Sequence, residues 1–540
     1  MAKQRWHEHP KLTPLILAIP AIGVLAGIWL ALSVTTGPQE VINAFGGSND
    51  LLPAMITRLV IPVAIGVGIA AVIVIAHRRG TRSQRSLRKR FLHAEGWTRR
   101  RRDNPNSPKG IRTRLHFLLP NTPGACIDDA SVLLGTDASG KPLLLTCDES
   151  MLIIGPPGSG KDRRVAAPLA AAWPGPALIT STKADLAHAV YEARAARGPI
   201  AIFDPASFGF ANASAMRWNP VTGCEDKDVA ARRAAAIIAG GSPSMSEQFW
   251  SVAASRILRG TLHAAALSGN NVLDAGQWAM SVSGWIAASE ILASFSETEW
   301  ANSLREDADL DPRTSSSITA TLTGTLMGLS NARLRAALTP VPGEVVVDIE
   351  QLLRASGTIF AVAPAEADSH LIYRPWTTLL ASEVAAVLRE MARGQRLEPP
   401  ALLLLNELVH VCPLPELPGL LADGRGHNIV TLVIVQDPAQ LAARYTPDEA
   451  RAITAAAQHR LLLSAGSDDT AREWSELIGT YRSTQRSRTH TPMGVTATSA
   501  NTSLEDRPIM PPEELRFIPY GCAVLLPRGQ APLPLQLQGT

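Results

Sequence analysis

The sequence predicts an α/β protein in which a parallel sheet is interrupted by an all-helical insertion and preceded by two N-terminal transmembrane helices. Short apolar runs alternate with helix-like stretches on both sides of a long helical block, the pattern of a sheet with helices on its faces. One run leads into a glycine-rich loop that ends in lysine. Two long apolar segments come before all of them.

The two N-terminal apolar segments are long enough to span a bilayer. Residues 14–34 carry no charged side chain, and residues 57–76 form a second apolar run. Each is close to the roughly 20 residues that cross the hydrocarbon core. A cleaved signal peptide is the alternative for the first segment, but a second span follows at once and no cleavage site is clear. Residues 1–76 are therefore predicted to be a membrane anchor.

The charges beside these spans predict their orientation. The intervening loop, residues 35–56, has no lysine or arginine, whereas residues 77–102 have eleven against one glutamate. By the positive-inside rule, the loop is external, and both termini and the main domain are cytoplasmic. We expect a multi-pass protein of the cell (inner or plasma) membrane. Because the whole chain carries only +3, the basic character is local to a juxtamembrane linker, residues 77–125, where anionic lipid is favoured over DNA as the partner.

The body of the chain alternates strands and helices around a helical block. Strands are predicted at 142–145, 151–154, 177–180 and 200–203, with helices at 161–173 and 184–197. A helical pattern then fills residues 225–345. Strands return at 358–362, 401–405, 429–435 and 460–464, and the stretch 483–501, rich in Ser, Thr and Arg, is predicted to be a mobile loop. The five cysteines form no C-x-x-C pair, which fits a reduced cytoplasmic body without a cysteine metal site.

The glycine-rich loop predicts a phosphate-binding site. In the pattern G-x-x-x-x-G-K-[ST], backbone N–H groups converge on phosphate oxygens, the lysine reaches the outer phosphates, and the final hydroxyl binds Mg²⁺. In this chain, an aspartate stands at the hydroxyl position. The predicted ATP-binding residues are Gly155, Pro156, Pro157, Gly158, Ser159, Gly160, Lys161 and Asp162.

A second polar element follows the apolar strand 401–405. In phosphate-loop enzymes, such a strand delivers an acidic residue to the Mg²⁺ shell, and a following glutamate can polarise the attacking water. Asn406 holds the metal-side position and Glu407 the base position. Gln436, at the end of another strand, is a candidate sensor of the γ-phosphate.

In this combination the sequence resembles the type IV secretion coupling proteins of the TraG/TraD-like group, membrane-anchored hexameric motors related to RecA-like and FtsK-like translocases. Four stretches carry the resemblance besides the loop: Phe203-Asp-Pro205 with Arg217-Trp-Asn-Pro220, Gln248-Phe-Trp250, Asn406-Glu-Leu-Val-His-Val-Cys-Pro-Leu-Pro-Glu416 with Asp423-Gly-Arg-Gly-His-Asn428, and Arg507-Pro-Ile-Met-Pro-Pro-Glu-Glu514. The resemblance implies a RecA-like P-loop NTPase core, in two parts at 126–224 and 346–540, around an all-helical insertion domain at 225–345.

Two positions depart from the family pattern, and both belong to the Mg²⁺ shell. The family usually has an aspartate where Asn406 stands, and a small or hydroxyl residue where Asp162 stands. The carboxylate has either moved to the loop, which makes Asp162 and Asn406 the metal residues, or it repels the phosphates and inactivates the site. The chain is accordingly interpreted as an ATPase with altered Mg²⁺-site residues, with ATP and Mg²⁺ as its cofactors.

The resemblance also implies a function and partners. A coupling ATPase recruits relaxase-bound single-stranded DNA or a protein cargo and delivers it to the components of a type IV secretion channel. It acts as a homo-hexamer, in which Arg425 of one subunit would stabilise the phosphate bound to the next; a surface arginine that caps a helix end is the alternative for this residue. For the whole protein, a non-hydrolysing cargo receptor and an FtsK-like double-stranded DNA translocase are the alternatives. The second is disfavoured, because no separate basic domain follows at the C-terminus.

Overall fold

The computed structural model describes residues 84–97, 105–206, 216–241, 248–364, 369–488 and 500–539. The chain divides into two compact units, Met1–Arg90 and Phe91–Thr540, and the fold below is that of the second unit. The predicted spans at 14–34 and 57–76 lie outside the described residues. Among the helices that are described, none combines the length and the hydropathy needed to cross a membrane.

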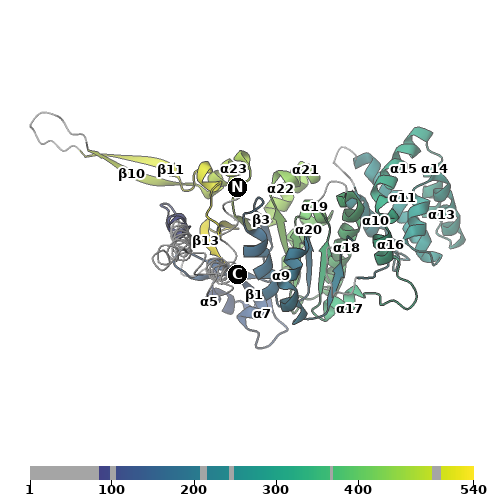
Figure 1. Ribbon diagram of the computed structural model, residues 1–540, viewed down its shortest axis with the longest axis horizontal. Coiled ribbons are helices and arrows are strands. Elements are labelled where there is room, and N and C mark those ends of the chain that lie inside the picture. The colour runs from purple at the N-terminus through teal and green to yellow at the C-terminus, as the bar shows by residue number, and fades with distance from the viewer. Residues whose placement is uncertain are drawn as a thin grey trace, which may run out of the picture. The chain divides into compact units, whose positions relative to one another are not determined.

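Eleven of the described strands of the second unit form one sheet, which Figure 1 shows among the helices. The strand order is β2-β1-β13-β12-β9-β3-β8-β7-β4-β6-β5. Seven consecutive strands of that order are parallel: β9 (His459–Leu462), β3 (Met151–Ile154), β8 (Ile429–Val435), β7 (Ala401–Asn406), β4 (Ala177–Ser181), β6 (Thr358–Val362) and β5 (Ile200–Phe203). Almost every residue of these strands is buried, as expected where helices cover both faces. The predicted α/β class is confirmed.

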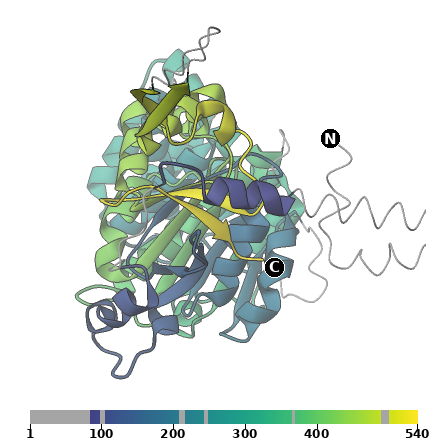
Figure 2. The same ribbon diagram turned by 90° about the vertical axis from the view of Figure 1, so that its left-hand side faces the viewer.

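The sheet is not wholly parallel, however, which corrects the sequence prediction. The remaining strands pair antiparallel at one edge: β2 (Pro142–Thr146), β1 (Ser131–Thr136), β13 (Leu533–Leu537) and β12 (Cys522–Pro527). Loops of only a few residues join β1 to β2 and β12 to β13, and such short connections can link only antiparallel neighbours. Figure 2 shows the C-terminal strands, in yellow, against the rest of the sheet.

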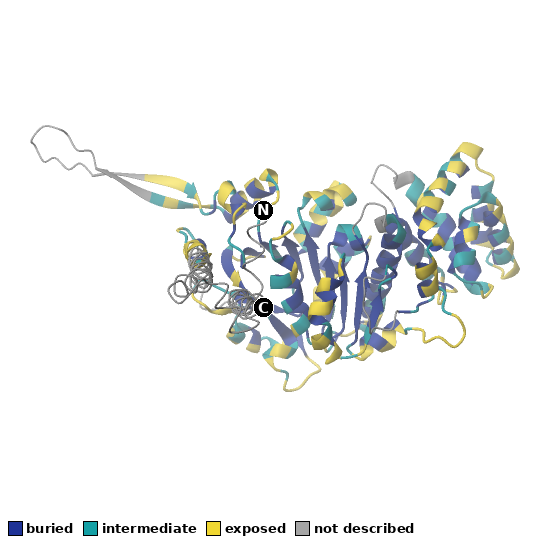
Figure 3. Cartoon of the chain, in the orientation of Figure 1, coloured by how far each residue is buried: buried dark blue, intermediate teal, exposed yellow. Residues whose placement is uncertain are grey.

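Helices cover both faces of the sheet because alternate residues of each strand point to opposite sides. Leu152 belongs to the core on one face, and Ile153 to the core on the other. Figure 3 shows the strands of the sheet largely in dark blue, the colour of buried residues. One face packs against α8 (Ala167–Ala172) and α9 (Ala184–Ala195). The helices on the opposite face include α18 (Ser369–Met391), α20 (Leu417–His427) and α22 (Pro447–Ala456).

Between β5 and β6, the described chain from Lys227 to Leu338 consists of helices joined by short turns. The helices are α10 (Lys227–Gly241), α11 (Gln248–Leu267), α12 (Val272–Ala279), α13 (Val282–Ser294), α14 (Thr298–Ala308), α15 (Pro312–Leu326) and α16 (Ala332–Leu338). In Figure 1, α11, α13, α14 and α15 gather beyond α10, which packs against α18 of the sheet layer. A buried ion pair fixes this junction: Arg233 Nη2 of α10 lies 2.7 Å from Glu383 Oε1 of α18.

A long hairpin follows α23 (Asp468–Ile478), where a mobile loop was predicted for 483–501. Strand β10 (Thr480–Arg488) pairs in register with β11 (Ala500–Pro508), and residues 489–499 lie outside the described chain. The prediction was wrong for the paired residues. Among the described residues no third strand pairs with this ribbon, and its sequence lacks the apolar alternation by which a half-buried strand is recognised.

Candidate functional site

The glycine-rich loop lies at the carboxyl edge of the parallel strands. It leaves β3 after Ile154, and the backbone N–H of Gly155 donates to the carbonyl of Val435 in β8 (3.1 Å). Gly158 and Gly160 have φ values of +83° and +90°, which side chains other than hydrogen rarely allow. The loop thus depends on glycine at two positions, as the tight turns of a phosphate-binding loop do.

The helix after the loop begins with an unusual turn. Residues Asp162–Ala166 form a π-helical turn, and the α-helix α8 starts only at Ala167. The sequence pattern had predicted one regular helix over 161–173. Single π turns occur often at functional sites, because they redirect side chains relative to the α-helical ladder.

Three predicted site residues meet at this edge. Lys161, which is only 5% exposed, places its Nζ 2.5 Å from Glu407 Oε1 and donates to the carbonyl of Gly155 (3.3 Å). Gln436 Nε2 donates to Glu407 Oε2 (3.0 Å). These residues follow β3, β7 and β8, and β8 lies between the other two strands. A lysine, a carboxylate and an amide from three neighbouring strands therefore share one hydrogen-bonded cluster.

Glu407 adopts a backbone conformation that is uncommon for its residue type. Its φ and ψ are 53° and 44°, in the left-handed region, immediately after β7 ends. Such conformations cost of order 1 kcal/mol or more and cluster at functional sites. Here the turn brings the carboxylate back over the sheet edge toward Lys161.

The two positions that depart from the family pattern touch each other. Asn406 Nδ2 donates to Asp162 Oδ1 (3.0 Å). Asn406 is buried, and its Oδ1 has no hydrogen-bond partner in the described structure. Burial raises the pKa of Asp162, against the opposing influence of Lys161 and of the hydrogen bond from Asn406, although the carboxylate keeps some exposed surface. Loop and strand thus form one polar site.

These residues fit a nucleotide with Mg²⁺. Mg²⁺ in phosphate sites is commonly held by one or two protein ligands together with phosphate oxygens and water, not by a cage of side chains. The described residues contain no group of three His, Cys, Asp or Glu side chains that could hold a metal. Asp162 Oδ2 and the unpartnered Asn406 Oδ1 are the oxygens available for the ion.

Arg425 does not join this cluster within the chain. It lies near the end of α20, before β8 begins, and its Nε is 3.3 Å from Asp148 Oδ2, which precedes β3. Both residues are therefore at the amino edge of the sheet, opposite the loop. The Arg425 side chain is 59% exposed, so its predicted contact with a neighbouring subunit stays a proposal.

Sequence reasoning missed two residues that contact the cluster. Gln440 Oε1 accepts from the backbone N–H of Gln436 (2.9 Å), and its Nε2 lies 3.3 Å from His410 Nε2. Tyr520 packs its ring against Gly160 from a segment far along the chain. Neither has a local signal, because an amide one helical turn after a strand and a lone tyrosine before a strand are common in any sequence.

Other stretches that carry the family resemblance are structural. Trp218 is buried and donates its backbone N–H to the carbonyl of Ala337 in α16, so it connects the segment that precedes α10 to the last helix of the insertion. Asn428 ends α20 in the left-handed conformation, and its buried Nδ2 donates to the carbonyl of Leu118.

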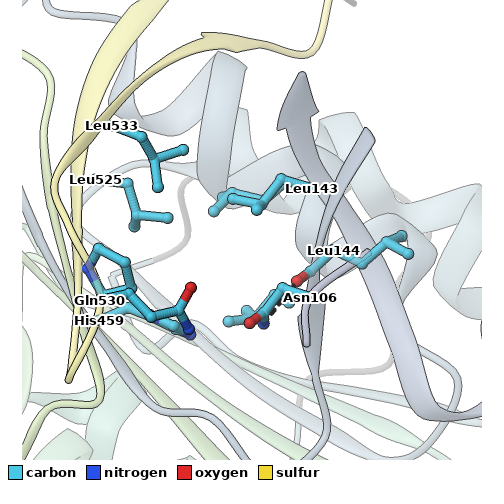
Figure 4. A pocket seen from close by; sticks show the side chains of 10 residues that line it. Asn106, Leu143, Leu144, His459, Leu525, Gln530 and Leu533 are labelled. Carbon is cyan, nitrogen blue, oxygen red and sulfur yellow. Dashed lines mark hydrogen bonds between the residues drawn. The ribbon is translucent and has the colours of Figure 1, made fainter. Parts of the chain in front are cut away.

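A small cavity beside Asn106 and His459, of about 10 Å³, is far too small for a nucleotide (Figure 4).

A glycine-rich loop that ends in lysine, after a parallel strand, with a carboxylate and an amide from neighbouring strands beside it, is the arrangement of a P-loop protein. The model of the family described as Type IV secretory system Conjugative DNA transfer matches residues 129–536, and the chain belongs to that family. No curated protein matches the chain in sequence.

Solved structures agree with this fold. The unbound bacterial conjugative coupling protein TrwB, lacking its N-terminal part, aligns with a TM-score of 0.56 at 15% identity over 75% of this chain and 88% of its own. TrwB in complex with ADP and Mg²⁺ aligns with a TM-score of 0.54 at 15% identity, over 76% of this chain and 94% of its own. At such identities the likeness establishes the fold alone.

Proposed function

We propose that this protein is a membrane-anchored coupling ATPase, which recruits relaxase-bound single-stranded DNA or a protein cargo and delivers it to a type IV secretion channel. The observation that carries the proposal is the cluster of Lys161, Glu407 and Gln436 at the phosphate loop. Membership of the conjugative DNA transfer family supports the DNA substrate. The complexes of TrwB with ADP and Mg²⁺, and with a non-hydrolysable ATP analogue, support ATP and Mg²⁺ as cofactors.

In the proposed mechanism, the phosphates of ATP compete with Glu407 for Lys161. Before ATP binds, Lys161 and Glu407 form an ion pair in which each side chain compensates the charge of the other. Once Lys161 turns to the phosphates, Glu407 is free to accept a proton from a water molecule, and Gln436 orients its carboxylate through the hydrogen bond to Oε2. Bound Mg²⁺ would neutralise phosphate charge, held through Asp162 and Asn406.

Hydrolysis by the full chain in a bilayer tests this function. Wild type should hydrolyse ATP in a Mg²⁺-dependent way, and single-stranded DNA should stimulate it. Lys161→Ala should weaken ATP binding by about 2–5 kcal/mol, because the phosphates of ATP lose the buried positive charge that pairs with them. Lys141→Ala is the matched control, since Lys141 is an exposed lysine in a turn at the far side of β2. Equal activity of Lys161→Ala and Lys141→Ala would overturn the proposal.

The same assay separates the alternatives. ATP binding without hydrolysis would favour a cargo receptor, and the aspartate at the hydroxyl position of the loop is the observation behind that candidate. Stimulation by double-stranded DNA alone would favour an FtsK-like translocase.

The proposal includes a homo-hexamer anchored by spans 14–34 and 57–76, with both termini and the main domain in the cytoplasm. The loop 35–56, which has no lysine or arginine, and the basic segment after the second span support this orientation. A single cysteine in place of Gly46 should react with an impermeant reagent on intact cells, and one in place of Ser83 should not. The reverse pattern would contradict the orientation.

A further inference from the structure

Tyr520 packs against the phosphate loop although it is far from it in sequence. A Cβ atom built on Gly160 would lie 2.8 Å from Tyr520 Cε2, so the ring rests directly on the last glycine of the loop. The guanidinium carbon of Arg164, in the π turn after the loop, lies 5.0 Å from the ring centroid. An aromatic ring and an arginine are thus paired beside the cradle.

Main-chain bonds fix the segment that carries this ring. After β9 ends, the backbone N–H of Ala465 donates to the carbonyl of Leu515 (2.9 Å), and Ser464 Oγ donates to the carbonyl of Arg516 (2.9 Å). Because β9 is the neighbour of β3, the segment between α24 (Pro512–Leu515) and β12 is held beside the loop that follows β3. The ring position therefore depends on the fold and not on a flexible tail.

The ring is available to a ligand. Tyr520 is only half-buried in the described structure. Arg164 is fixed from the other end, since its Nη1 donates to the carbonyl of Gln538 (3.0 Å). A nucleotide whose phosphates lie in the cradle and at the start of the helix must place its base outside the loop. Tyr520 and Arg164 border the loop at the residues where it becomes helix.

We propose that Tyr520, backed by Arg164, is a stacking platform for the base of the bound nucleotide. The inference rests on the proposed nucleotide site and adds the subsite for its base. Stacking on an aromatic ring tolerates every base, because each base has a π face. The platform should therefore support ATP and GTP about equally, and it should contribute nothing to the binding of inorganic tripolyphosphate, which has no base.

Calorimetric titration of the full chain with ATP, GTP and tripolyphosphate, each with Mg²⁺, tests the platform. Tyr520→Ala should weaken ATP and GTP about tenfold, the order of magnitude expected for loss of one base–aromatic contact. Its affinity for tripolyphosphate should stay unchanged, and Tyr520→Phe should bind all three ligands as wild type does. Phe517→Ala is the matched control, since Phe517 is an aromatic residue of the same segment and is 79% exposed. It should bind like wild type.

Each other outcome overturns the platform in a distinct way. Equal weakening of ATP and tripolyphosphate in Tyr520→Ala would mean that the ring supports the loop and not the base. Equal losses in Tyr520→Phe and Tyr520→Ala would assign the effect to the hydroxyl. Unchanged ATP affinity in Tyr520→Ala would exclude a role in binding. If wild type binds none of the three ligands, the proposed nucleotide site itself fails, which is distinguishable from failure of the platform alone.

Discussion

Buried charged side chains have different partners at the two edges of the parallel sheet. At the amino edge, Arg194 is fully buried, yet its guanidinium donates to the carbonyls of Trp173 and Gly175 and to the hydroxyl of Thr358. Glu149 accepts from Asn106 Nδ2 at the same edge (2.6 Å). These charged groups are bound by fixed partners within the fold.

The carboxyl edge leaves polar atoms without such partners. Asn406 Oδ1 and Ser159 Oγ are buried and make no hydrogen bond in the described structure. Lys161 and Glu407 are paired mainly with each other, and Glu407 holds an uncommon backbone conformation. The comparison teaches that burial of charge does not by itself mark a functional site. An unpartnered buried atom or a left-handed residue does not mark it alone either, since the amino edge has the buried, unpartnered Nδ1 of His459 and the left-handed Asn428. At the carboxyl edge both features coincide with the phosphate loop and the pair of Lys161 and Glu407, and this coincidence marks the edge that is built for a ligand.

The largest effect on stability is expected at Arg194. Arg194→Met fills similar volume but leaves the carbonyls of Trp173 and Gly175 without their donors. We expect a loss of about 3 kcal/mol in the free energy of unfolding, since each unsatisfied buried acceptor costs about 1–3 kcal/mol. Urea unfolding measures this loss, and ATP affinity of the folded variant should be unchanged. A folded variant with weakened ATP affinity would break the distinction between the two edges.

A pH-dependent effect is expected at Glu149. Burial opposes its ionisation, but the charge and hydrogen bond of His459 and the bonds from Thr146 outweigh it and lower the pKa from 4.5 to about 2. Because the folded pKa is depressed, the stabilisation is fully present above pH 4.5 and is lost as pH falls toward 2. Unfolding midpoints of wild type should therefore fall over this range. Glu149→Gln should show a flatter profile, with about 2 kcal/mol less stability at neutral pH.

The next prediction concerns the coupling free energy between Asp162 and Asn406, which tests the carboxyl edge of the sheet directly. Asp162→Thr removes the carboxylate, and Asn406→Asp places a second carboxylate beside the first, so each change alone should lower kcat/KM for ATP. The double variant restores hydroxyl plus aspartate, and its loss should be smaller than the sum by about 1–3 kcal/mol.

The outcome of this cycle separates the two interpretations of the site. Additive losses would show that the two residues do not share a metal. Hydrolysis that appears only in the double variant would identify the parent as a receptor with a degenerate site.

The smallest effect on stability is expected at Arg425. Its pair with Asp148 is largely open to solvent on the arginine side, and such pairs contribute about 0–1 kcal/mol. Arg425→Ala should therefore shift the unfolding midpoint little and leave ATP affinity unchanged. The hydrolysis rate of the assembled protein decides whether a neighbouring site uses this residue, since loss of an arginine finger lowers kcat about 10³-fold or more.

Much of the fold could be predicted because the parallel strands are buried on both faces. The runs 151–154, 200–203, 358–362 and 429–435 are strands with those same bounds in the structure, since a short apolar run bounded by turn residues is recognisable alone. Strands β1, β12 and β13 went unpredicted. Each of them has one partner next to it in the chain, but β1 also pairs with β13, and β12 also pairs with β9. A local sequence pattern gives no information about these distant pairings.

The site shows the same division between local and distant information. Gly155 to Asp162 form a contiguous motif, and Asn406 and Glu407 follow a recognisable strand. The motif could not predict that Asn406 donates to Asp162, nor that Tyr520 packs on Gly160. The position of Arg425 at the opposite edge was equally hidden, because spacing along a helix does not tell which end of the sheet that helix meets.

The pairing of β1 with β13 also constrains the order in which the domain can be assembled. Strand β1 is synthesised early, but Gly135 and Thr136 pair with Leu537 and Gln536, near the end of the chain. The ribosome must therefore release almost the whole domain before this side of the sheet can close. Until then β1 presents an unpaired edge, the kind of surface through which nascent chains associate wrongly. A chain that ended before β13 would carry that open edge permanently.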